Sequence, residues 1–200
     1  MIGYDPGQAV QSLAQARVHR ECELTLSASV MTVGAFDGVH HGHQALLTRV
    51  VDEARRNGVP SVIYTFETPP KVVFQGALQL TPPAERIRRF SLFSIDHIIM
   101  ARFDKDYSAR PAMSFIQELG RLNPRGLWVG ADFRFGKDRS GDIAMLARYF
   151  SLHILEDVAA CEGKRVSSTR LRALIAEGRR EEARRLHGWP DVGCLPGTVL

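Results

Sequence analysis

Three histidines and three glycines crowd one short stretch, GAFDGVHHGHQALL, directly after an apolar run. His40 and His43 are three residues apart, and the glycines let the backbone turn sharply and approach a ligand closely. If a helix begins near Gly42, its free N–H groups and the positive end of its dipole face this loop. Phosphate oxygens are natural ligands for such a place, and the two imidazoles would add donors. The stretch therefore predicts a phosphate site, with ordinary surface histidines as the alternative.

Zinc is a second alternative for the same residues, because His40 and His43 could both act as ligands. No carboxylate or cysteine stands at metal-ligand spacing nearby, although His19 and Cys22 precede the stretch. We therefore expect no dedicated metal site.

Another group of phosphate-binding residues follows later, in SSTRLRALIAEG. The hydroxyls of Ser168 and Thr169 stand at the start of a predicted helix, where backbone N–H groups are free. Arg172 lies one turn further on, and its planar guanidinium can grip a phosphate by two bonds. An ordinary helix cap is the alternative. Two such helix starts, facing each other across one cleft, could hold a triphosphate.

The stretch GADFRFGKD is close to a phosphate-binding P-loop but fails its spacing. Five residues rather than four separate its glycines, and Asp138 follows the lysine where Ser or Thr is needed. Asp132, Phe133 and Phe135 instead offer a hydrogen-bonding carboxylate beside aromatic surface, which suits a flat ligand. Core packing of both rings is the alternative.

Alternating strands and helices must position these residues. Strands are predicted over 29–35, 60–66, 97–103, 126–132 and 152–158. Helices are predicted over 42–58, 84–93, 111–122, 141–150, 167–178 and 180–188. This alternation favours an α/β fold with a parallel sheet covered on both faces, and ligands then bind at the carboxyl ends of the strands.

Composition excludes several protein classes. The 200 residues are 44% hydrophobic and 24% charged, which is typical of a globular domain. The three cysteines are far apart and odd in number, so a reducing cytoplasm is the simplest expectation. Basic residues are scattered despite the net charge of +4, so we expect no nucleic-acid partner. No apolar run approaches membrane-span length, so we expect no membrane association.

The wider pattern resembles a known family. TVGAFDGVHHGHQALL is similar to the G-x-F-D-G-x-H-x-G-H-Q motif of the bacterial bifunctional riboflavin kinase/FAD synthetase family, in its FMN adenylyltransferase module. Four further blocks resemble that module in the same order: YTFETPP (64–70), VGADFRFGKDRSGD (129–142), RVSSTRLRALIAEG (165–178) and EEARRLHGWP (181–190). Together the blocks span residues 30–190, nearly the whole chain.

The resemblance implies a Rossmann-like nucleotidyltransferase domain that joins FMN to ATP, giving FAD and pyrophosphate, with Mg²⁺ carried in by ATP. The implied catalytic residues are His40, His43 and Arg172. The implied ATP-binding residues are Gly34, Phe36, Gly42, Ser168 and Thr169. The implied flavin-binding residues are Asp132, Phe133, Phe135 and Phe66, and a core position is the alternative for Phe66.

The chain departs from the family pattern in places. Ala35 replaces the usual Asn, Thr68 replaces the first Pro of F-E-P-x-P, and His187 interrupts the closing block. We expect an extension over 1–28, the transferase domain over 29–188, and over 189–200 a linker or the start of a missing riboflavin kinase domain.

Two other functions stay open. One is a transferase of the same fold that uses another phosphorylated acceptor. The other is a non-catalytic flavin or nucleotide binder, suggested by Ala35 and by the missing kinase half.

Overall fold

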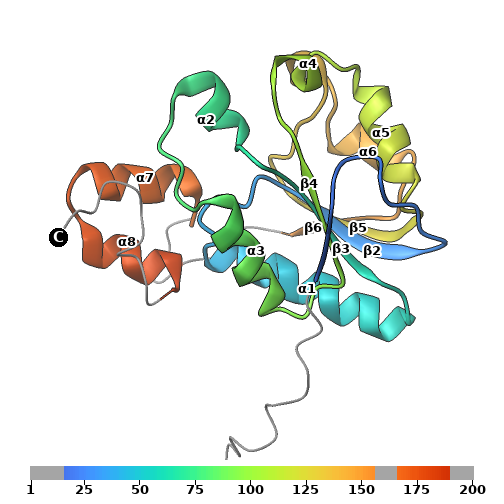
Figure 1. Cartoon of the computed structure of the whole chain (residues 1–200), viewed down its shortest axis with the longest axis horizontal. Helices are drawn as coiled ribbons and strands as arrows, with labels where there is room; N and C mark the ends of the chain where they lie inside the picture. The colour runs from blue at the N-terminus through green and yellow to red at the C-terminus, as the bar shows by residue number, and fades with distance from the viewer. Residues whose placement is uncertain (1–15, 156–165, 190–200) are drawn as a thin grey trace, which may run out of the picture.

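A six-stranded parallel sheet forms the centre of the computed structural model, which describes residues 16–155 and 166–189. The strand order is β1-β4-β3-β2-β5-β6 (Figure 1). The strands are β1 (Arg17–His19), β2 (Ser29–Val33), β3 (Ser61–Phe66), β4 (His97–Ala101), β5 (Pro124–Gly130) and β6 (Leu152–Leu155). Because β2, β3 and β4 are buried along their whole length, their sequences are mostly apolar rather than alternating between apolar and polar residues.

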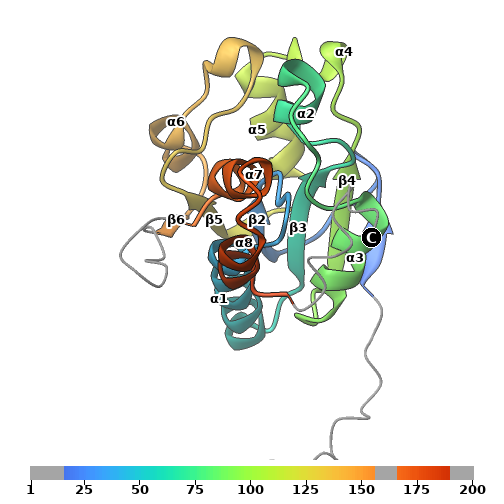
Figure 2. The same ribbon diagram turned by 90° about the vertical axis from the view of Figure 1, so that its left-hand side faces the viewer.

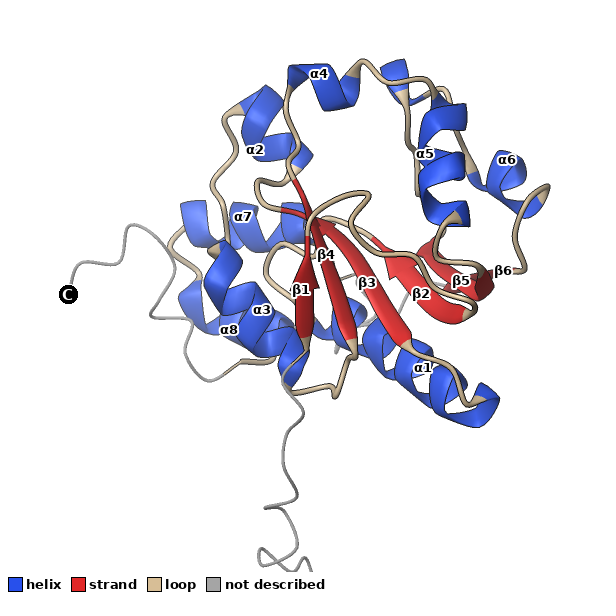
Figure 3. Cartoon of the chain, turned by 45° about the vertical axis from the view of Figure 1, so that its right-hand side comes forward, coloured by secondary structure: helices blue, strands red, loops and turns tan. Residues whose placement is uncertain are grey.

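Helices cover both faces of this sheet (Figure 3). On one face, α1 (His41–Asn57) and α3 (Pro83–Ser91) pack against the sheet. On the other face lie α5 (Ala112–Gly120) and α6 (Ile143–Ala147). The apolar stripe of α1 is buried at all its positions: Leu46, Leu47, Val50, Val51 and Ala54. The expected α/β fold, with a parallel sheet covered on both faces, is confirmed.

Two further helices lie together at one end of the molecule (Figures 1 and 2). They are α7 (Ser168–Ala176) and α8 (Arg180–His187). Their apolar residues form a small core of their own with Leu80 and Val166. This core attaches the last helices to the segment that precedes α3.

Three short elements were not expected from the sequence: β1, α2 (Pro70–Gln75) and α4 (Lys105–Ser108). None has an apolar stripe, since α2 and α4 bury no residue and two of the three β1 residues are exposed. A short 3-10 turn, η2 (Lys137–Arg139), completes the described elements.

The five predicted strands and six predicted helices are all present, with ends that shift by a few residues. The last predicted strand is described as far as Leu155, and its remaining residues (156–158) lie outside the described part of the chain. Among the described residues, the helices are too short or too polar to cross a membrane.

Candidate functional site

His40 and His43 stand together at the start of α1. His40 is the N-cap of this helix, and its Nδ1 accepts a hydrogen bond from the backbone N–H of His43 at 3.4 Å. The two imidazole rings stack, with centroids 3.6 Å apart. The edge of the buried Phe36 ring meets the ring of His43 at 5.1 Å between centroids. The loop thus presents two imidazoles as one stacked unit on an apolar support.

The backbone of this loop is tightly constrained. Phe36 and Val39 have φ values of 48° and 45°, which side chains rarely adopt. A Cβ at Gly34 would lie 3.1 Å from the Phe36 ring, and one at Gly42 would lie 3.3 Å from Nδ1 of His40. A side chain at either position would therefore crowd these rings, and Gly38, with a φ of 91°, has a backbone conformation that favours glycine.

His43 is neutral in the free protein. Burial lowers its pKa well below the usual value, and the neighbouring His40, Arg86 and His187 lower it further. Its buried Nδ1 has no hydrogen-bond partner in the described structure. A bound phosphate would reverse this balance, because a nearby negative charge favours the imidazolium.

The start of α7 lies beside the start of α1. Ser168 Oγ donates to the backbone carbonyl of Asp37 at 2.7 Å. The carbonyl of Val166 lies 3.9 Å from the place of a Cβ at Gly42. Thr169 Oγ1 accepts from Lys71 Nζ at 2.7 Å, so one cation from α2 is already at this helix start. The N-terminal ends of two helices thus lie close to one another, as a polyphosphate site requires, although His40 and Ser167 each cap one N–H group there.

Arg172 is engaged within the protein. Its Nη2 lies 2.5 Å from Oδ2 of Asp37, and its Nε donates to the carbonyl of Leu78 at 2.7 Å. The Asp37 carboxylate also accepts from the N–H groups of Leu80 and Thr81. Burial raises the pKa of Asp37, while these N–H donors and the Arg172 guanidinium act against that rise. Arg172 therefore ties α7 to the histidine loop, and its direct contact with phosphate stays a prediction.

Aromatic side chains gather beyond the ends of β3 and β4. Phe66 is buried, with Phe103 and Tyr107 at 5.0 and 5.7 Å between ring centroids. The exposed ring of Phe74, from α2, meets Phe103 at 5.8 Å. This cluster offers a flat apolar surface at the carboxyl ends of the strands, the same edge of the sheet at which the histidine loop begins.

Phe133 and Phe135, in the loop after β5, belong to the same hydrophobic core as Phe66. Phe133 and Phe135 stack at 5.8 Å, and Phe135 packs on Phe115. Phe135 is buried, Phe133 is half-buried and Asp132 is exposed. Phe135 is thus a core residue, whereas Phe133 and Asp132 remain accessible to a ligand.

A buried polar network fixes the aromatic cluster from below. The hydroxyl of Tyr64 donates to Oε1 of Glu118 and lies 2.8 Å from the hydroxyl of Tyr107. Arg110 pairs with the other oxygen of Glu118 at 2.7 Å. Burial raises the pKa of both tyrosines, so both hydroxyls stay protonated.

Sequence reasoning missed the arginines of α3. Arg86 is fully buried and donates to the carbonyls of Ala35 and Glu67. Arg89 donates to the carbonyl of Gly38 at 3.1 Å and lies 2.9 Å from Nε2 of His187. Nothing in an Arg-rich helix marks two of its arginines as buried, since such helices are usually solvated.

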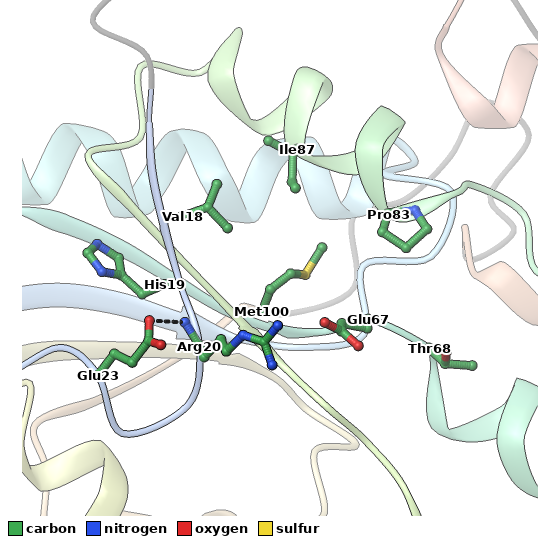
Figure 4. Close-up of a pocket in the computed structure, with 9 residues that line it drawn as sticks. All are labelled: Val18, His19, Arg20, Glu23, Glu67, Thr68, Pro83, Ile87 and Met100. Carbon is green, nitrogen blue, oxygen red and sulfur yellow. Dashed lines mark hydrogen bonds between the residues drawn. The ribbon is translucent and has the colours of Figure 1, made fainter.

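An open groove of about 570 Å³ runs along the β1 edge of the sheet (Figure 4). Glu67 and Thr68 form one end, and the side chains of Glu67 and Arg20 point toward one another. None of the residues that the sequence assigned to catalysis, to ATP or to the flavin lines this groove. The backbone carbonyl of Glu67 accepts a hydrogen bond from Arg86, while its side chain lines the groove.

In the described part of the chain, no group of three or more His, Cys, Asp or Glu side chains could hold a metal ion. His19 and His97 do lie together, at 3.0 Å between Nε2 and Nδ1, at the β1 edge. Cys22 is free and exposed.

Comparison with known proteins gives a consistent assignment. Residues 22–170 match the family model described as FAD synthetase. A putative bifunctional riboflavin kinase/FMN adenylyltransferase of Geobacillus thermodenitrificans is 48% identical over 167 residues, covering 84% of this chain and 93% of the relative. The bifunctional riboflavin kinase/FMN adenylyltransferase of Escherichia coli is 34% identical over 192 residues, covering 92% of this chain and 61% of the relative.

Solved structures support the fold. A crystal structure described as a macrolide-efflux protein from Streptococcus pneumoniae superposes with a TM-score of 0.77 at 29% identity. The match covers 88% of this chain and 62% of that one. This chain thus spans about three fifths of both the E. coli relative and the solved structure.

Proposed function

Since the chain belongs to the FAD synthetase family, we propose that it is an FMN adenylyltransferase, which transfers the AMP unit of ATP to FMN and releases pyrophosphate. The family membership confirms the resemblance of the five sequence blocks. The observation that supports the activity most directly is that the N-terminal ends of α1 and α7 lie close together. The stacked rings of His40 and His43 stand at the first of these helix ends.

The reaction needs position and charge more than a base. An oxygen of the FMN phosphate attacks the α-phosphorus of ATP, and the bond from that phosphorus to the bridging oxygen of the β-phosphate breaks. The electron pair leaves with pyrophosphate. A phosphate monoester is already anionic, so catalysis rests on alignment and on donors to the phosphate oxygens.

The histidine pair supplies such donors. A neutral His43 carries one N–H, and negative charge arriving at the site favours a second proton on its ring. His40 supports it by stacking and by capping α1. We assign the triphosphate to the free N–H groups of both helix starts, with Gly34, Gly42, Ser168 and Thr169 around it and Phe36 beneath it.

In the ligand-free protein the Arg172 guanidinium forms an ion pair with Asp37. This guanidinium lies at the α7 start, so a triphosphate could take over one of its N–H groups while the carbonyl of Leu78 keeps another. Arg172 would then stabilise the leaving pyrophosphate.

The flavin ring would lie on the aromatic cluster at the ends of β3 and β4. Phe74 is exposed and stands beside Phe103, while Phe66 supports Phe103 from the core. Phe133 closes the cluster from the β5 loop, and Asp132 can accept from an N–H at the flavin edge. Phe135 would act by supporting Phe133.

Mg²⁺ would arrive bound to ATP and reduce the charge on its phosphates. Its ligands would be phosphate oxygens and water, since Mg²⁺ keeps much of its hydration. The protein groups at this site are N–H groups and imidazoles rather than carboxylates. They would therefore bind the phosphates and leave Mg²⁺ to phosphate oxygens and water.

We assign the transferase domain to residues 29–188, preceded by a segment over 1–28 whose β1 extends the sheet. The riboflavin kinase named in its relatives would be supplied by a domain beyond residues 189–200 or by another chain. A reducing cytoplasm, where FMN and ATP are available, is consistent with the free Cys22.

One experiment tests the activity and its acceptor. The purified chain is supplied with ATP, Mg²⁺ and FMN, and pyrophosphate and FAD are measured. FMN should give both products, and riboflavin should give neither because it lacks the attacking phosphate. Flavin binding without pyrophosphate release would instead identify a binder, and pyrophosphate release with another phosphorylated acceptor alone would identify a different transferase.

A further inference from the structure

Arg86 is an unusual buried cation. The residue has no exposed surface, and burial lowers its pKa to about 10, so it remains charged at neutral pH. Among the described residues, no carboxylate lies within ion-pairing distance of it. Its Nε is buried without a hydrogen-bond partner. Asp37 is the carboxylate that acts on it through space, from beyond ion-pairing distance. A buried cation with no directly paired carboxylate costs stability, so its presence calls for a role in the site.

The two carbonyls that Arg86 binds come from different loops. Nη1 donates to Ala35 at 2.8 Å, in the loop after β2, and Nη2 donates to Glu67, directly after β3. The first loop leads to His40 and His43. The second leads through Thr68 to α2 and its exposed Phe74. One planar guanidinium thus spans the nucleotide side and the flavin side of the cleft.

Arg86 also acts on the histidine pair through space. It is among the groups that hold the pKa of His43 low. The other groups facing His43 are His40 from its own helix start and His187 from α8. The positive charge of Arg86 therefore lies close to where phosphate oxygens would bind.

We propose that Arg86 is a positioning residue that fixes the nucleotide loop relative to the flavin loop and supplies a constant positive charge beneath the phosphate site. The proposal rests on the function above, because it assumes that both loops hold substrates. Arg86 therefore has two effects that can be tested apart. Its guanidinium joins the two loops by hydrogen bonds, and its positive charge acts on the phosphate site. Lysine keeps the charge but cannot span both carbonyls as a planar fork does.

Two variants separate these effects, with Arg88→Met as the control. Arg88 lies in the same helix and is exposed, so its removal should change nothing. Arg86→Met should weaken binding of inorganic pyrophosphate about tenfold by calorimetry, and lower kcat about 100-fold. In the same variant the pKa of His43, measured by NMR titration, should rise by about half a unit or more. Arg86→Lys should lower kcat about tenfold while pyrophosphate affinity and the His43 titration stay as in the parent.

These readouts keep the outcomes apart. If the parent chain forms no FAD, the proposed function fails, whereas the pyrophosphate and NMR measurements still test the charge of Arg86. A folded Arg86→Met with parental pyrophosphate affinity and His43 titration would overturn the charge role. Full kcat in Arg86→Lys would overturn the positioning role. Should Arg86→Met not fold, Arg86→Lys and its unchanged His43 titration carry the test, and a shifted titration there would contradict the proposal.

Discussion

At the scale of single residues, the site depends on a stacked pair of imidazoles, one of which, His43, is kept neutral. The His40 ring caps α1 and supports His43, and burial keeps the His43 ring uncharged until an anion arrives. The neighbouring His41 is exposed and packs near Gly188 instead. Adjacent histidines of one loop thus have different surroundings, which makes them a matched pair for mutation.

Replacing His43 should therefore cost activity without costing the fold. His43→Ala should lower kcat with ATP and FMN by about 100- to 1,000-fold, the usual loss when one donor to a developing charge is removed. His41→Ala should keep nearly full activity. Equal activity of the two variants, measured as pyrophosphate release, would show that the stacked imidazole takes no part in catalysis.

The low pKa of His43 also makes stability depend on pH. The folded protein protonates His43 below the usual value of 6.5, so the unfolded chain takes up the proton first as pH falls. The free energy of unfolding should consequently decrease as pH falls below about 6.5. His97, whose pKa is lowered by burial and by His19, acts in the same direction. Urea titrations at pH 7.5 and 5.5 should show a smaller difference for His43→Asn than for the parent, and an unchanged difference would contradict the assignment.

At the scale of elements, α7 is held onto the histidine loop by buried polar contacts. Asp37 receives two backbone N–H groups and the Arg172 guanidinium, and its own carbonyl receives the hydroxyl of Ser168. The C-terminal helices have only a small apolar core of their own. These polar contacts therefore decide where the α7 start lies relative to α1.

Removing the carboxylate should loosen that arrangement. Asp37→Ala leaves the partly buried Arg172 guanidinium without its carboxylate and with the Leu78 carbonyl as its remaining acceptor, which should lower the free energy of unfolding by about 3 kcal/mol. Glu182→Ala breaks an exposed ion pair between Glu182, in α8, and Arg179, the N-cap of that helix. This change should lower the free energy of unfolding by less than about 1 kcal/mol. Denaturant titration gives both values, and comparable losses would mean that the buried pair is no more important than a surface pair.

The short helix α2 provides a test of the flavin side. Phe74 is 53% exposed, so its removal should leave the fold intact. Phe74→Ala should raise KM for FMN about five- to tenfold and leave KM for ATP unchanged, because an aromatic contact with the flavin is lost. Tyr149→Ala, an exposed aromatic beyond α6, should change neither constant. An unchanged KM for FMN in Phe74→Ala would remove α2 from the flavin site.

At the scale of the whole molecule, the sequence predicted the sheet and its covering helices well. Local patterns suffice for that, since β2 is a short run rich in Val and Met and α1 has an apolar stripe that ends at the C-cap Gly58. The contacts that complete the site join distant positions and leave no local pattern. Arg86 binds the carbonyl of Ala35 across 51 positions, and Arg172 reaches Asp37 across 135. The short α2 could not be predicted because its residues bury nothing.

Two helix starts and a stacked histidine pair are expected to hold ATP while the phosphate of FMN attacks it. The most direct measurement follows FAD and pyrophosphate formation by the purified chain with ATP and Mg²⁺, with FMN and riboflavin in parallel. FMN should give equal amounts of FAD and pyrophosphate, and riboflavin should give neither product. A folded chain that binds ATP and FMN yet forms no FAD would contradict this expectation.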